Sequence, residues 1–370
     1  MSFFSGCGGS STGFHMAEDF IEVLAYENNE HAIRSFHLNY PNVPVTNLIG
    51  IDKVFKNGKG KKNELDQIHS DLNGEDVIVK ANTWYKMMNN DELLNMKIRD
   101  LDVLAASPPC QDFSMANTER NFKMNSHKNN LFLETIRLID EIKPKVAVIE
   151  NVPGMMRGKM KSIFLQILCK MAKTEYKFSY KILNATKYGV PQSRDRIIFI
   201  GVRKDIAKTL IRKESFDASW WPEEQKFEIK KICLKSIVPR AFYYSSGQFD
   251  DCLIPASEVV GTITRTASMK FYDEKFCDFD PNIEEVKKLF GFPVNYKLYD
   301  SEKQGKEDPA TGKPYIDPNS DAANPQEYNR GLKYERLGNS VAPPLMKAIA
   351  ISIKEKILKP YYTSISENIE

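Results

Sequence analysis

The sequence predicts an α/β protein with a doubly wound sheet and a second, smaller domain that is largely β or irregular. Up to about residue 200, short apolar runs alternate with longer amphipathic stretches, which is the pattern of strands covered by helices. Beyond residue 203 this rhythm breaks into short aromatic and polar pieces. The last forty residues regain helical spacing, so we expect them to return to the first domain.

The strands of the first domain are predicted from runs of apolar residues at 23–26, 103–106, 146–149 and 197–202. Each run is rich in β-branched or other apolar residues and is bounded by polar or turn-forming residues, as expected for buried strands. A helix is predicted at 131–142, where apolar residues recur at steps of three and four. It ends before Pro144, because a residue that precedes proline is disfavoured in a helix.

The domain division follows from the same patterns. We expect a first domain of residues 1–203, completed by about residues 332–370, and a small domain of residues 204–331. The length of 370 residues exceeds what one hydrophobic core usually serves, which favours this division. Residues 301–331 combine Pro, Gly, Asn, Asp and Lys with little periodicity, so we predict a mobile insertion there. No pattern assigns a role to this insertion or to residues 56–100.

Composition and charge exclude several classes of protein. No stretch approaches about 18 uninterrupted apolar residues, and the N-terminus lacks the regions of a signal peptide, so we expect a cytoplasmic protein without membrane association. The six cysteines are scattered singly, without the paired spacings of a zinc site, so no metal is predicted. A net charge of +3 is too small to identify a nucleic-acid partner.

The first motif is a glycine-rich turn that follows a short apolar strand, Phe4-Ser5-Gly6-Cys7-Gly8-Gly9. Glycines remove the Cβ atoms that would keep a ligand from approaching the backbone. Hydroxyl residues that can cap a helix come next in the sequence. Taken alone, the turn is explained equally well by a tight structural connection.

Glu27 and Asn28 come directly after the predicted strand 23–26. In dinucleotide-type folds this position places a carboxylate against ribose hydroxyls. The glycine-rich turn also lacks the Lys-Ser/Thr pair of a phosphate-binding loop. Together these features favour a nucleoside-type cofactor over a triphosphate, although a glutamate after a strand is by itself unremarkable.

Cys110 lies in a proline-stiffened loop directly after strand 103–106, within Ser107-Pro108-Pro109-Cys110-Gln111. Ligands of doubly wound sheets bind at the carboxyl ends of strands, so this cysteine is well placed to act as a nucleophile. A lone cysteine is more often a small buried hydrophobe. The spacing alone therefore leaves both interpretations open.

Charged residues also flank the last two predicted strands. Glu150 and Asn151 end the run that begins at residue 146, and Arg194 and Arg196 precede the run that begins at residue 197. A carboxylate at the end of an apolar strand is suited to giving or sharing a proton. Two arginines at i and i+2 can brace an acidic neighbour or hold a base carbonyl. Capping and surface salt bridges are the alternative explanations.

Taken in order, these motifs resemble those of the cytosine carbon-5 DNA methyltransferase family. The matching segments are Phe4-Ser5-Gly6-Cys7-Gly8-Gly9, Pro109-Cys110-Gln111, Glu150-Asn151-Val152, Gln192-Ser193-Arg194-Asp195-Arg196 and Gly338-Asn339-Ser340-Val341. Five ordered motifs are far more specific than any single one. The resemblance implies a Rossmann-like methyltransferase sheet in residues 1–203 and a small target-recognition domain in residues 204–331.

The resemblance also implies roles for the matching residues. S-adenosylmethionine would be bound by Phe4, Ser5, Gly6, Cys7, Gly8, Gly9, Glu27, Asn28, Asp52, Pro108, Leu131, Asn339, Ser340 and Val341. Cys110 would add to carbon 6 of a cytosine flipped out of DNA, and Glu150 would hydrogen-bond ring nitrogen 3. Arg194 would hold the base carbonyl and brace the site, and the remaining residues expected in the catalytic site are Gln111, Asn151 and Arg196.

A member of this family is expected to act on double-stranded DNA as a monomer, with a cognate restriction endonuclease as a further partner. Neither the recognised DNA sequence nor the presence of the endonuclease can be read from these motifs. The family's first motif usually begins with an acidic residue in a longer strand, and Ser2 stands in that place here.

Three alternatives share part of this pattern. A tRNA cytosine methyltransferase of the same fold typically carries a Cys-Phe-Thr signature, which this sequence lacks. A zinc-dependent nucleobase deaminase would need a second cysteine three residues after Cys110, where Phe113 stands. A catalytically silent DNA-binding relative is disfavoured, because Cys110, Glu150 and Arg194 are all present.

Overall fold

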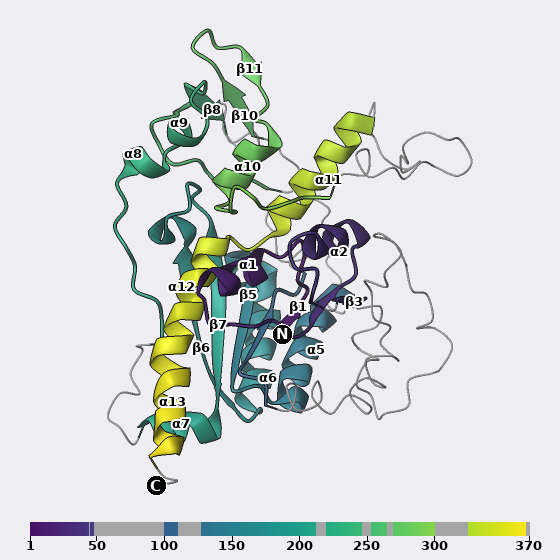
Figure 1. The fold of residues 1–370 in the computed structure, drawn as a ribbon, viewed down its shortest axis with the longest axis vertical. Coiled ribbons are helices and arrows are strands. Elements are labelled where there is room, and N and C mark those ends of the chain that lie inside the picture. The colour runs from purple at the N-terminus through teal and green to yellow at the C-terminus, as the bar shows by residue number, and fades with distance from the viewer. Residues whose placement is uncertain are drawn as a thin grey trace, which may run out of the picture.

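The fold was analysed in a computed structural model. It describes residues 1–43, 45–47, 100–109, 127–211, 220–245, 253–264, 269–299 and 325–367 (Figure 1). The predicted mobile insertion therefore lies outside the described residues up to position 324, and residues 56–99 lie outside them as well. From Pro325 onward the predicted insertion is helical, which corrects its expected C-terminal end.

The centre of the molecule is a seven-stranded sheet with the order β3-β2-β1-β4-β5-β7-β6. Its first five strands in this order are parallel, and β7 runs antiparallel to both of its neighbours. The strands are β1 (Ser2–Phe3), β2 (Ala25–Glu27), β3 (Val45–Asn47), β4 (Val103–Ala106), β5 (Val146–Asn151), β6 (Tyr176–Asn184) and β7 (Asp195–Arg203).

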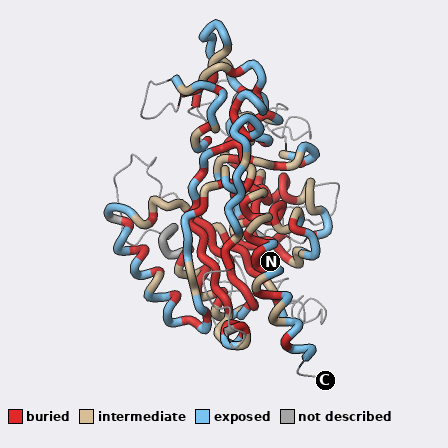
Figure 2. The backbone as a smooth tube through the Cα atoms, turned by 90° about the vertical axis from the view of Figure 1, so that its left-hand side faces the viewer, coloured by how far each residue is buried: buried red, intermediate tan, exposed pale blue. Residues whose placement is uncertain are grey.

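Helices cover both faces of this sheet, so the predicted doubly wound α/β fold is confirmed (Figure 1). On one face, α5 (His127–Ile142) and α6 (Lys161–Ala172) pack on side chains such as Phe199. On the other face, α7 (Lys204–Ile211) and α12 (Pro343–Ile353) pack on the alternate side chains of the same strands. Figure 2 shows the strands as the buried centre of the molecule, which explains their nearly continuous apolar sequences.

The C-terminal helix returns to the first sheet, as the sequence predicted. Helix α12 packs along α1 (Gly9–Met16), with the backbones so close that a Cβ on Gly13 would lie 2.5 Å from Met346 Cβ. It continues through a π-helical turn into α13 (Lys359–Ser366), which lies beside α7. The glycine-rich turn that begins at Phe4 is thereby held in direct contact with the motif Gly338–Val341, called the C-terminal motif below.

A second, four-stranded antiparallel sheet has the order β11-β10-β8-β9. Its strands are β8 (Tyr243–Ser245), β9 (Ile254–Pro255), β10 (Lys270–Tyr272) and β11 (Asp278–Phe279). It shares a hydrophobic cluster with α9 (Leu234–Ile237), α10 (Ile283–Leu289) and α11 (Pro325–Asn339). A small, largely β region therefore accompanies the large sheet, while the exact domain boundaries stay a prediction.

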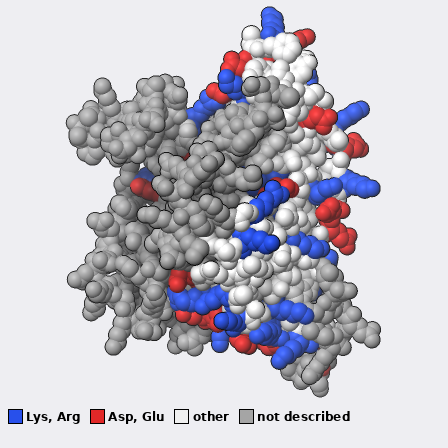
Figure 3. Space-filling view, turned by 180° about the vertical axis from the view of Figure 1, so that it is seen from behind, with Lys and Arg blue, Asp and Glu red and all other residues white. Residues whose placement is uncertain are grey.

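Two surface properties bear on the expected partners. Within the described part of the chain, no helix is both long and apolar enough to cross a lipid bilayer. Figure 3 shows Lys and Arg side chains interspersed with Asp and Glu side chains on the described part of one face. This mixture agrees with the small net charge of +3.

Candidate active site

A cavity of about 240 Å³ lies at the carboxyl ends of β1, β2, β4 and β5. Ligands of parallel α/β sheets bind at this edge, because the loops that leave the strands can present polar groups there. Its lining comes from segments far apart in the sequence: the turn after β1, the turn after β2, the loop after β4, the end of β5, the start of β7, and the end of α11 with the residues that follow it.

The glycine-rich turn is shaped by backbone conformations that favour glycine. Gly6 has a φ of 56° and Gly8 a φ of 96°, both in the left-handed region. A Cβ on Gly9 would lie 2.3 Å from the carbonyl oxygen of Val341. The turn thus packs closely against Ser340 and Val341 of the C-terminal motif, and this close approach explains why glycine is required at position 9.

Glu27 is buried at the end of β2 and accepts three backbone hydrogen bonds. The N–H of Gly6 donates to its Oε2 at 2.7 Å, and the N–H groups of Asn28 and Asn29 donate to its Oε1 at 2.8 and 2.9 Å. Burial raises the pKa of the Glu27 carboxyl group, and the three N–H donors oppose that shift. A carboxylate offers about four acceptor sites, so at least one stays free for a ligand hydroxyl.

Cys7 connects the glycine-rich turn to the C-terminal motif. Its Sγ lies 3.0 Å from Ser340 Oγ and 3.6 Å from the carbonyl oxygen of Arg336. The side chain is fully buried, and this burial raises the pKa of the Cys7 thiol. A buried thiol with a raised pKa is a poor nucleophile, so Cys7 serves to hold the two segments together.

Glu150 and Arg196 form a buried ion pair at the edge of the cavity. Arg196 Nε lies 2.7 Å from Glu150 Oε1, and both side chains are about nine-tenths buried. The antiparallel pairing of β5 with β7 sets Asn151 opposite Ile197, which brings Arg196 to the end of β5. The pair combines an acceptor and a donor that face the same cavity.

Asn151 links the end of β5 to the loop that leads to Cys110. Its side-chain amide donates to the carbonyl oxygen of Pro108 at 3.2 Å, and its Oδ1 accepts the N–H of Val152 at 2.8 Å. Pro108 and Pro109 both line the cavity. Cys110 itself lies outside the described residues.

Arg194 is a fully buried brace. Its guanidinium donates to the carbonyl oxygens of Ile263 at 3.1 Å, Gly338 at 2.5 Å and Ser340 at 3.0 Å. These bonds join the segment before β7 to the small-sheet region and to the C-terminal motif. The expected bracing role fits this arrangement, whereas the arginine in contact with Glu150 is Arg196.

The cavity brings together most of the residues predicted from sequence. Its lining includes Phe4, Ser5, Gly6, Cys7, Gly9, Glu27, Asn28, Pro108, Glu150, Asn151, Arg196, Asn339, Ser340 and Val341. Three other predicted residues that the structure describes do not line it: Gly8, Leu131 and Arg194. The remaining three, Asp52, Cys110 and Gln111, lie outside the described residues.

Sequence reasoning missed several residues that line the cavity. Asn29 follows Glu27 and caps α2 (Glu30–His37) by accepting the N–H of Ala32, a role that its place before a helix could have indicated. Arg336 is buried and donates to the carbonyl oxygens of His31 and Tyr299. No sequence pattern marks Arg336, because its partners are distant in the chain.

Residues 80–275 match the family model of C-5 cytosine-specific DNA methylases. This segment is more than half of the chain, and it contains the motifs around Cys110, Glu150 and Arg196. The chain belongs to the C-5 cytosine-specific DNA methylase family.

Several curated relatives support this membership. The chain is 32% identical over 205 residues to the type II methyltransferase M.DdeI of Desulfomicrobium norvegicum, covering 55% of this chain and 40% of that protein. It is 31% identical over 203 residues to M1.HphI of Haemophilus parahaemolyticus, covering 55% and 45%. It is 31% identical over 213 residues to M.AquIA of a Picosynechococcus strain, covering 55% and 71%. The match thus spans less than half the length of the first two relatives.

Two solved structures share the fold. One is a prophage-encoded E. coli protein described as a DNA modification methyltransferase, with a TM-score of 0.56, 18% identity, and coverage of 97% of this chain and 98% of that one. The other is a variant of Spodoptera frugiperda DNMT2, with a TM-score of 0.51, 16% identity and coverage of 98% of both chains. At these identities the likeness concerns the fold alone.

Proposed function

We propose that this protein is a DNA (cytosine-5) methyltransferase that uses S-adenosylmethionine and attacks a flipped cytosine through Cys110. One observation carries the proposal. A single cavity joins the glycine-rich turn and Glu27, which suit a nucleoside cofactor, to the buried pair of Glu150 and Arg196, which suits a polar base.

The cofactor half of the cavity fits S-adenosylmethionine by the chemistry of its donors and acceptors. Glu27 keeps acceptor capacity for a ribose hydroxyl after its three backbone bonds. The positive φ of Gly6 lets the backbone approach a ligand without a side chain in the way, and a Cβ there would meet no atom within 4 Å. When bound, the cofactor supplies an electrophilic methyl group.

The residues at the other end of the cavity act on the base. The Cys110 thiolate forms a bond to carbon 6. Glu150 carries a proton on the oxygen that does not contact Arg196, and it donates this proton in a hydrogen bond to ring nitrogen 3 as negative charge develops there. Bound S-adenosylmethionine would supply the methyl group to carbon 5, and its sulfonium would leave as the thioether. Loss of the carbon-5 proton to a base then restores the double bond between carbons 5 and 6 as the bond to Cys110 breaks. A cytosine can reach these groups only outside the base stack, so base flipping is part of the proposal.

Arg196 is the arginine that we assign to the base carbonyl. Its guanidinium is planar, and after the 2.7 Å contact with Glu150 it has further N–H donors for an oxygen at the cavity edge. Asn151 acts on Cys110 indirectly, since it holds the carbonyl of Pro108 two residues before the nucleophile. We propose that Arg194 contributes by bracing the fold.

We infer double-stranded DNA as the substrate, with the region of the small sheet reading its sequence. The relatives named M.DdeI and M1.HphI are type II methyltransferases, which supports a cognate restriction endonuclease as a partner. We expect the protein to act as a cytoplasmic monomer.

Transfer of a tritiated methyl group from S-adenosylmethionine, measured in parallel on double-stranded DNA and on tRNA, tests the proposed function. We expect label in carbon-5 methylcytosine of DNA and none in tRNA. Exposed Cys169 provides a matched control, since Cys169→Ala should keep activity while Cys110→Ala loses it. Label in tRNA alone, or in a base other than cytosine, would refute the assignment.

A further inference from the structure

The glycine-rich turn is contacted from outside the seven-stranded sheet by a segment that follows α10. This segment, residues 292–299, is held to α10 by Lys287, whose Nζ donates to the carbonyl oxygen of Tyr296 at 2.5 Å. Phe292 and Tyr296 belong to the hydrophobic cluster that the small sheet shares with α10, and Cys7 of the turn belongs to the same cluster. The small-sheet region and the glycine-rich turn therefore share one packed core.

Tyr296 contacts the backbone of the turn directly. Its side chain is only 4% exposed, and its hydroxyl donates to the carbonyl oxygen of Cys7. Burial raises the pKa of Tyr296 well above its ordinary value, so the hydroxyl keeps its proton and remains a donor over the whole physiological range of pH. The peptide that joins Cys7 to Gly8 is thus held from the small-sheet region.

Gly8 is the point at which the turn passes into α1. It has a φ of 96° and is the N-cap of the helix. Its N–H donates to the carbonyl oxygen of Ser5 at 2.9 Å, and its carbonyl oxygen accepts the N–H of Thr12 at 2.8 Å. A Cβ on Gly8 would lie 2.7 Å from the Tyr296 hydroxyl and 3.2 Å from the Phe36 ring. These aromatic side chains therefore enclose the junction between the turn and the helix.

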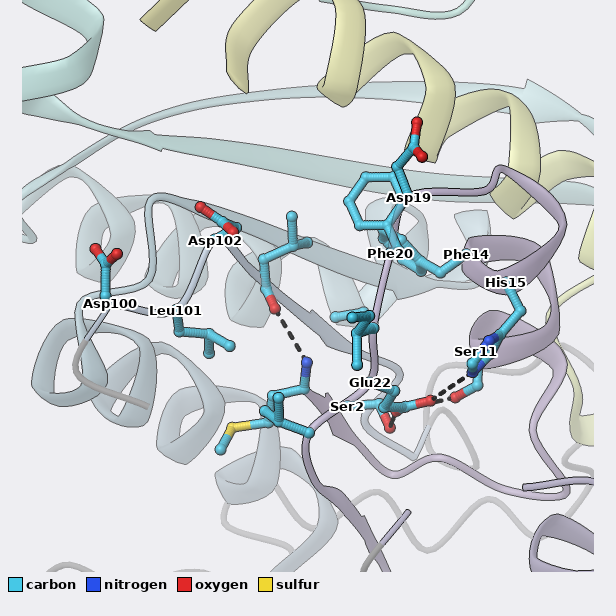
Figure 4. A pocket seen from close by; sticks show the side chains of 15 residues that line it. Ser2, Ser11, Phe14, His15, Asp19, Phe20, Glu22, Asp100, Leu101 and Asp102 are labelled. Atoms are coloured by element: carbon cyan, nitrogen blue, oxygen red, sulfur yellow. Dashed lines mark hydrogen bonds and ion pairs between the residues drawn. The ribbon is translucent and has the colours of Figure 1, made fainter. Parts of the chain in front are cut away.

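The first turn of α1 faces the candidate active site. Gly9 and Ser10 line the cavity, and the N–H groups at the start of a helix have no acceptor within that helix. Figure 4 shows the next residue, Ser11, whose Oγ donates at 3.1 Å to Oε1 of Glu22, in the segment that leads into β2. That contact holds the helix from the large sheet, whereas the contact of Tyr296 holds its N-cap from the small-sheet region.

The same segment also contacts α2, which follows Glu27 and begins at the cavity. The N–H of Tyr299 donates to Ser35 Oγ at 3.0 Å, and Arg34 Nη1 donates to the Tyr299 hydroxyl at 3.0 Å. Residues 292–299 thus bond to α2 as well as to the start of α1. Both helices that begin at the cofactor half of the cavity are fixed by one segment of the small-sheet region.

We propose that Tyr296 is a positioning residue for the cofactor, because it holds the Cys7–Gly8 peptide and so sets the direction of the turn that lines the cavity. The inference rests on the proposed function, since it requires that S-adenosylmethionine binds beside this turn. Tyr296 itself does not line the cavity, so it acts through the turn. The small-sheet region, which is proposed to recognise DNA, thereby also contributes to the affinity for the cofactor.

Tyr296→Phe removes the hydroxyl and keeps the ring, so it tests the hydrogen bond without opening a cavity. The dissociation constant of S-adenosylhomocysteine, the demethylated cofactor, should rise about tenfold in calorimetry without DNA, because the turn is no longer held in the binding conformation. Amide hydrogen exchange at Gly8 and Thr12 of the cofactor-free protein should become about tenfold faster, because both N–H groups bond within the segment that Tyr296 holds.

Tyr244→Phe is the matched control. Tyr244 is 3% exposed and lies in the same hydrophobic cluster, and its hydroxyl donates to the carbonyl oxygen of Val259 at 2.9 Å. Each variant loses one buried hydrogen bond, so the Tm of both should fall by similar amounts. Only Tyr296→Phe should weaken the binding of S-adenosylhomocysteine and speed exchange at Gly8 and Thr12.

Equal losses of affinity in the two variants, or unchanged exchange in Tyr296→Phe, would overturn the proposal. A wild-type protein that binds no S-adenosylhomocysteine would instead refute the proposed function. In that case the exchange rates would still decide whether Tyr296 holds the turn, so the two failures are distinguishable.

Discussion

At the scale of single residues, the buried Glu27 is expected to lower the stability of the folded protein when it is ionised, and it is also proposed to bind the cofactor. Burial raises the pKa of its carboxyl group, so the folded protein keeps a proton on Glu27 at a pH where the unfolded chain has lost it. The stabilising contribution of this proton is fully present below about pH 4.3, which is the ordinary pKa of a glutamate side chain in an unfolded chain. It is lost as the pH rises through the raised pKa of the folded state.

Glu27→Gln removes this titration and also removes the charged acceptor. Without cofactor, the Tm of the wild type should fall as the pH rises from about 4 to neutral, and the Tm of the variant should change less over the same range, in a series of melting curves. The affinity of the variant for S-adenosylmethionine, measured by calorimetry, should fall about tenfold or more, because a hydrogen bond to a charged group is lost. Glu141→Gln, with a side chain 43% exposed, should change neither quantity. Undiminished affinity in Glu27→Gln would exclude a ribose contact.

The two arginines of the Gln192–Arg196 segment are predicted to differ in what they affect. Arg194→Lys leaves some of the carbonyls of Ile263, Gly338 and Ser340 without a donor, so its Tm should fall by about 4 °C or more. Arg196→Lys keeps a charge beside Glu150 but loses the planar donor fork, so kcat/KM should fall about a hundredfold with little change in Tm. A large loss of kcat/KM in Arg194→Lys, together with a large loss of Tm in Arg196→Lys, would instead assign the base carbonyl to Arg194.

At the scale of elements, strands that are buried on both faces were predicted well. Residues 103–106 coincide with β4, and residues 146–149 and 197–202 lie within β5 and β7. The strand predicted at 23–26 begins two residues later, at Ala25. Strand β6 was missed because it is an edge strand with several exposed residues, so its sequence is not continuously apolar.

The arrangement of the site was predicted in part. The order of the motifs identified the residues that gather at the carboxyl ends of the strands, because parallel strands place their ends together. The pairing of Arg196 with Glu150 was not foreseen, since it depends on β7 lying antiparallel beside β5. The tie from Cys7 to Ser340 was also not foreseen, since it spans nearly the whole chain.

The close contact between α1 and the C-terminal motif leads to a prediction about two helical glycines. Alanine is favoured over glycine in a helix by about 1 kcal/mol, so Gly331→Ala, with no atom within 4 Å of the new Cβ, should be stabilising. Gly9→Ala should instead destabilise the protein by about 1–3 kcal/mol, because its Cβ would lie 2.3 Å from the carbonyl of Val341. Urea unfolding of both variants measures the two effects, and a stable Gly9→Ala protein would contradict the packing.

At the scale of the whole molecule, we propose that the seven-stranded sheet carries the site of methyl transfer and that the region of the small sheet recognises the DNA sequence. Replacing residues 203–283 by the corresponding segment of a family member with known specificity should transfer the recognised DNA sequence and leave methyl transfer intact. Bisulfite sequencing of DNA from cells that express the chimera reads out the modified sites. Specificity that stayed with residues 1–202 would place recognition in the large sheet instead.

The covalent attack by Cys110 is the central claim, and a mechanism-based trap tests it most directly. In duplex DNA whose target cytosine carries fluorine at carbon 5, the methylated adduct cannot lose a proton from that carbon, so the bond to the enzyme persists. We predict a complex that survives denaturing electrophoresis, requires S-adenosylmethionine for full yield and maps by peptide mass to Cys110. Cys110→Ala should form no complex. An adduct at another cysteine, or full methylation by Cys110→Ala, would contradict the account.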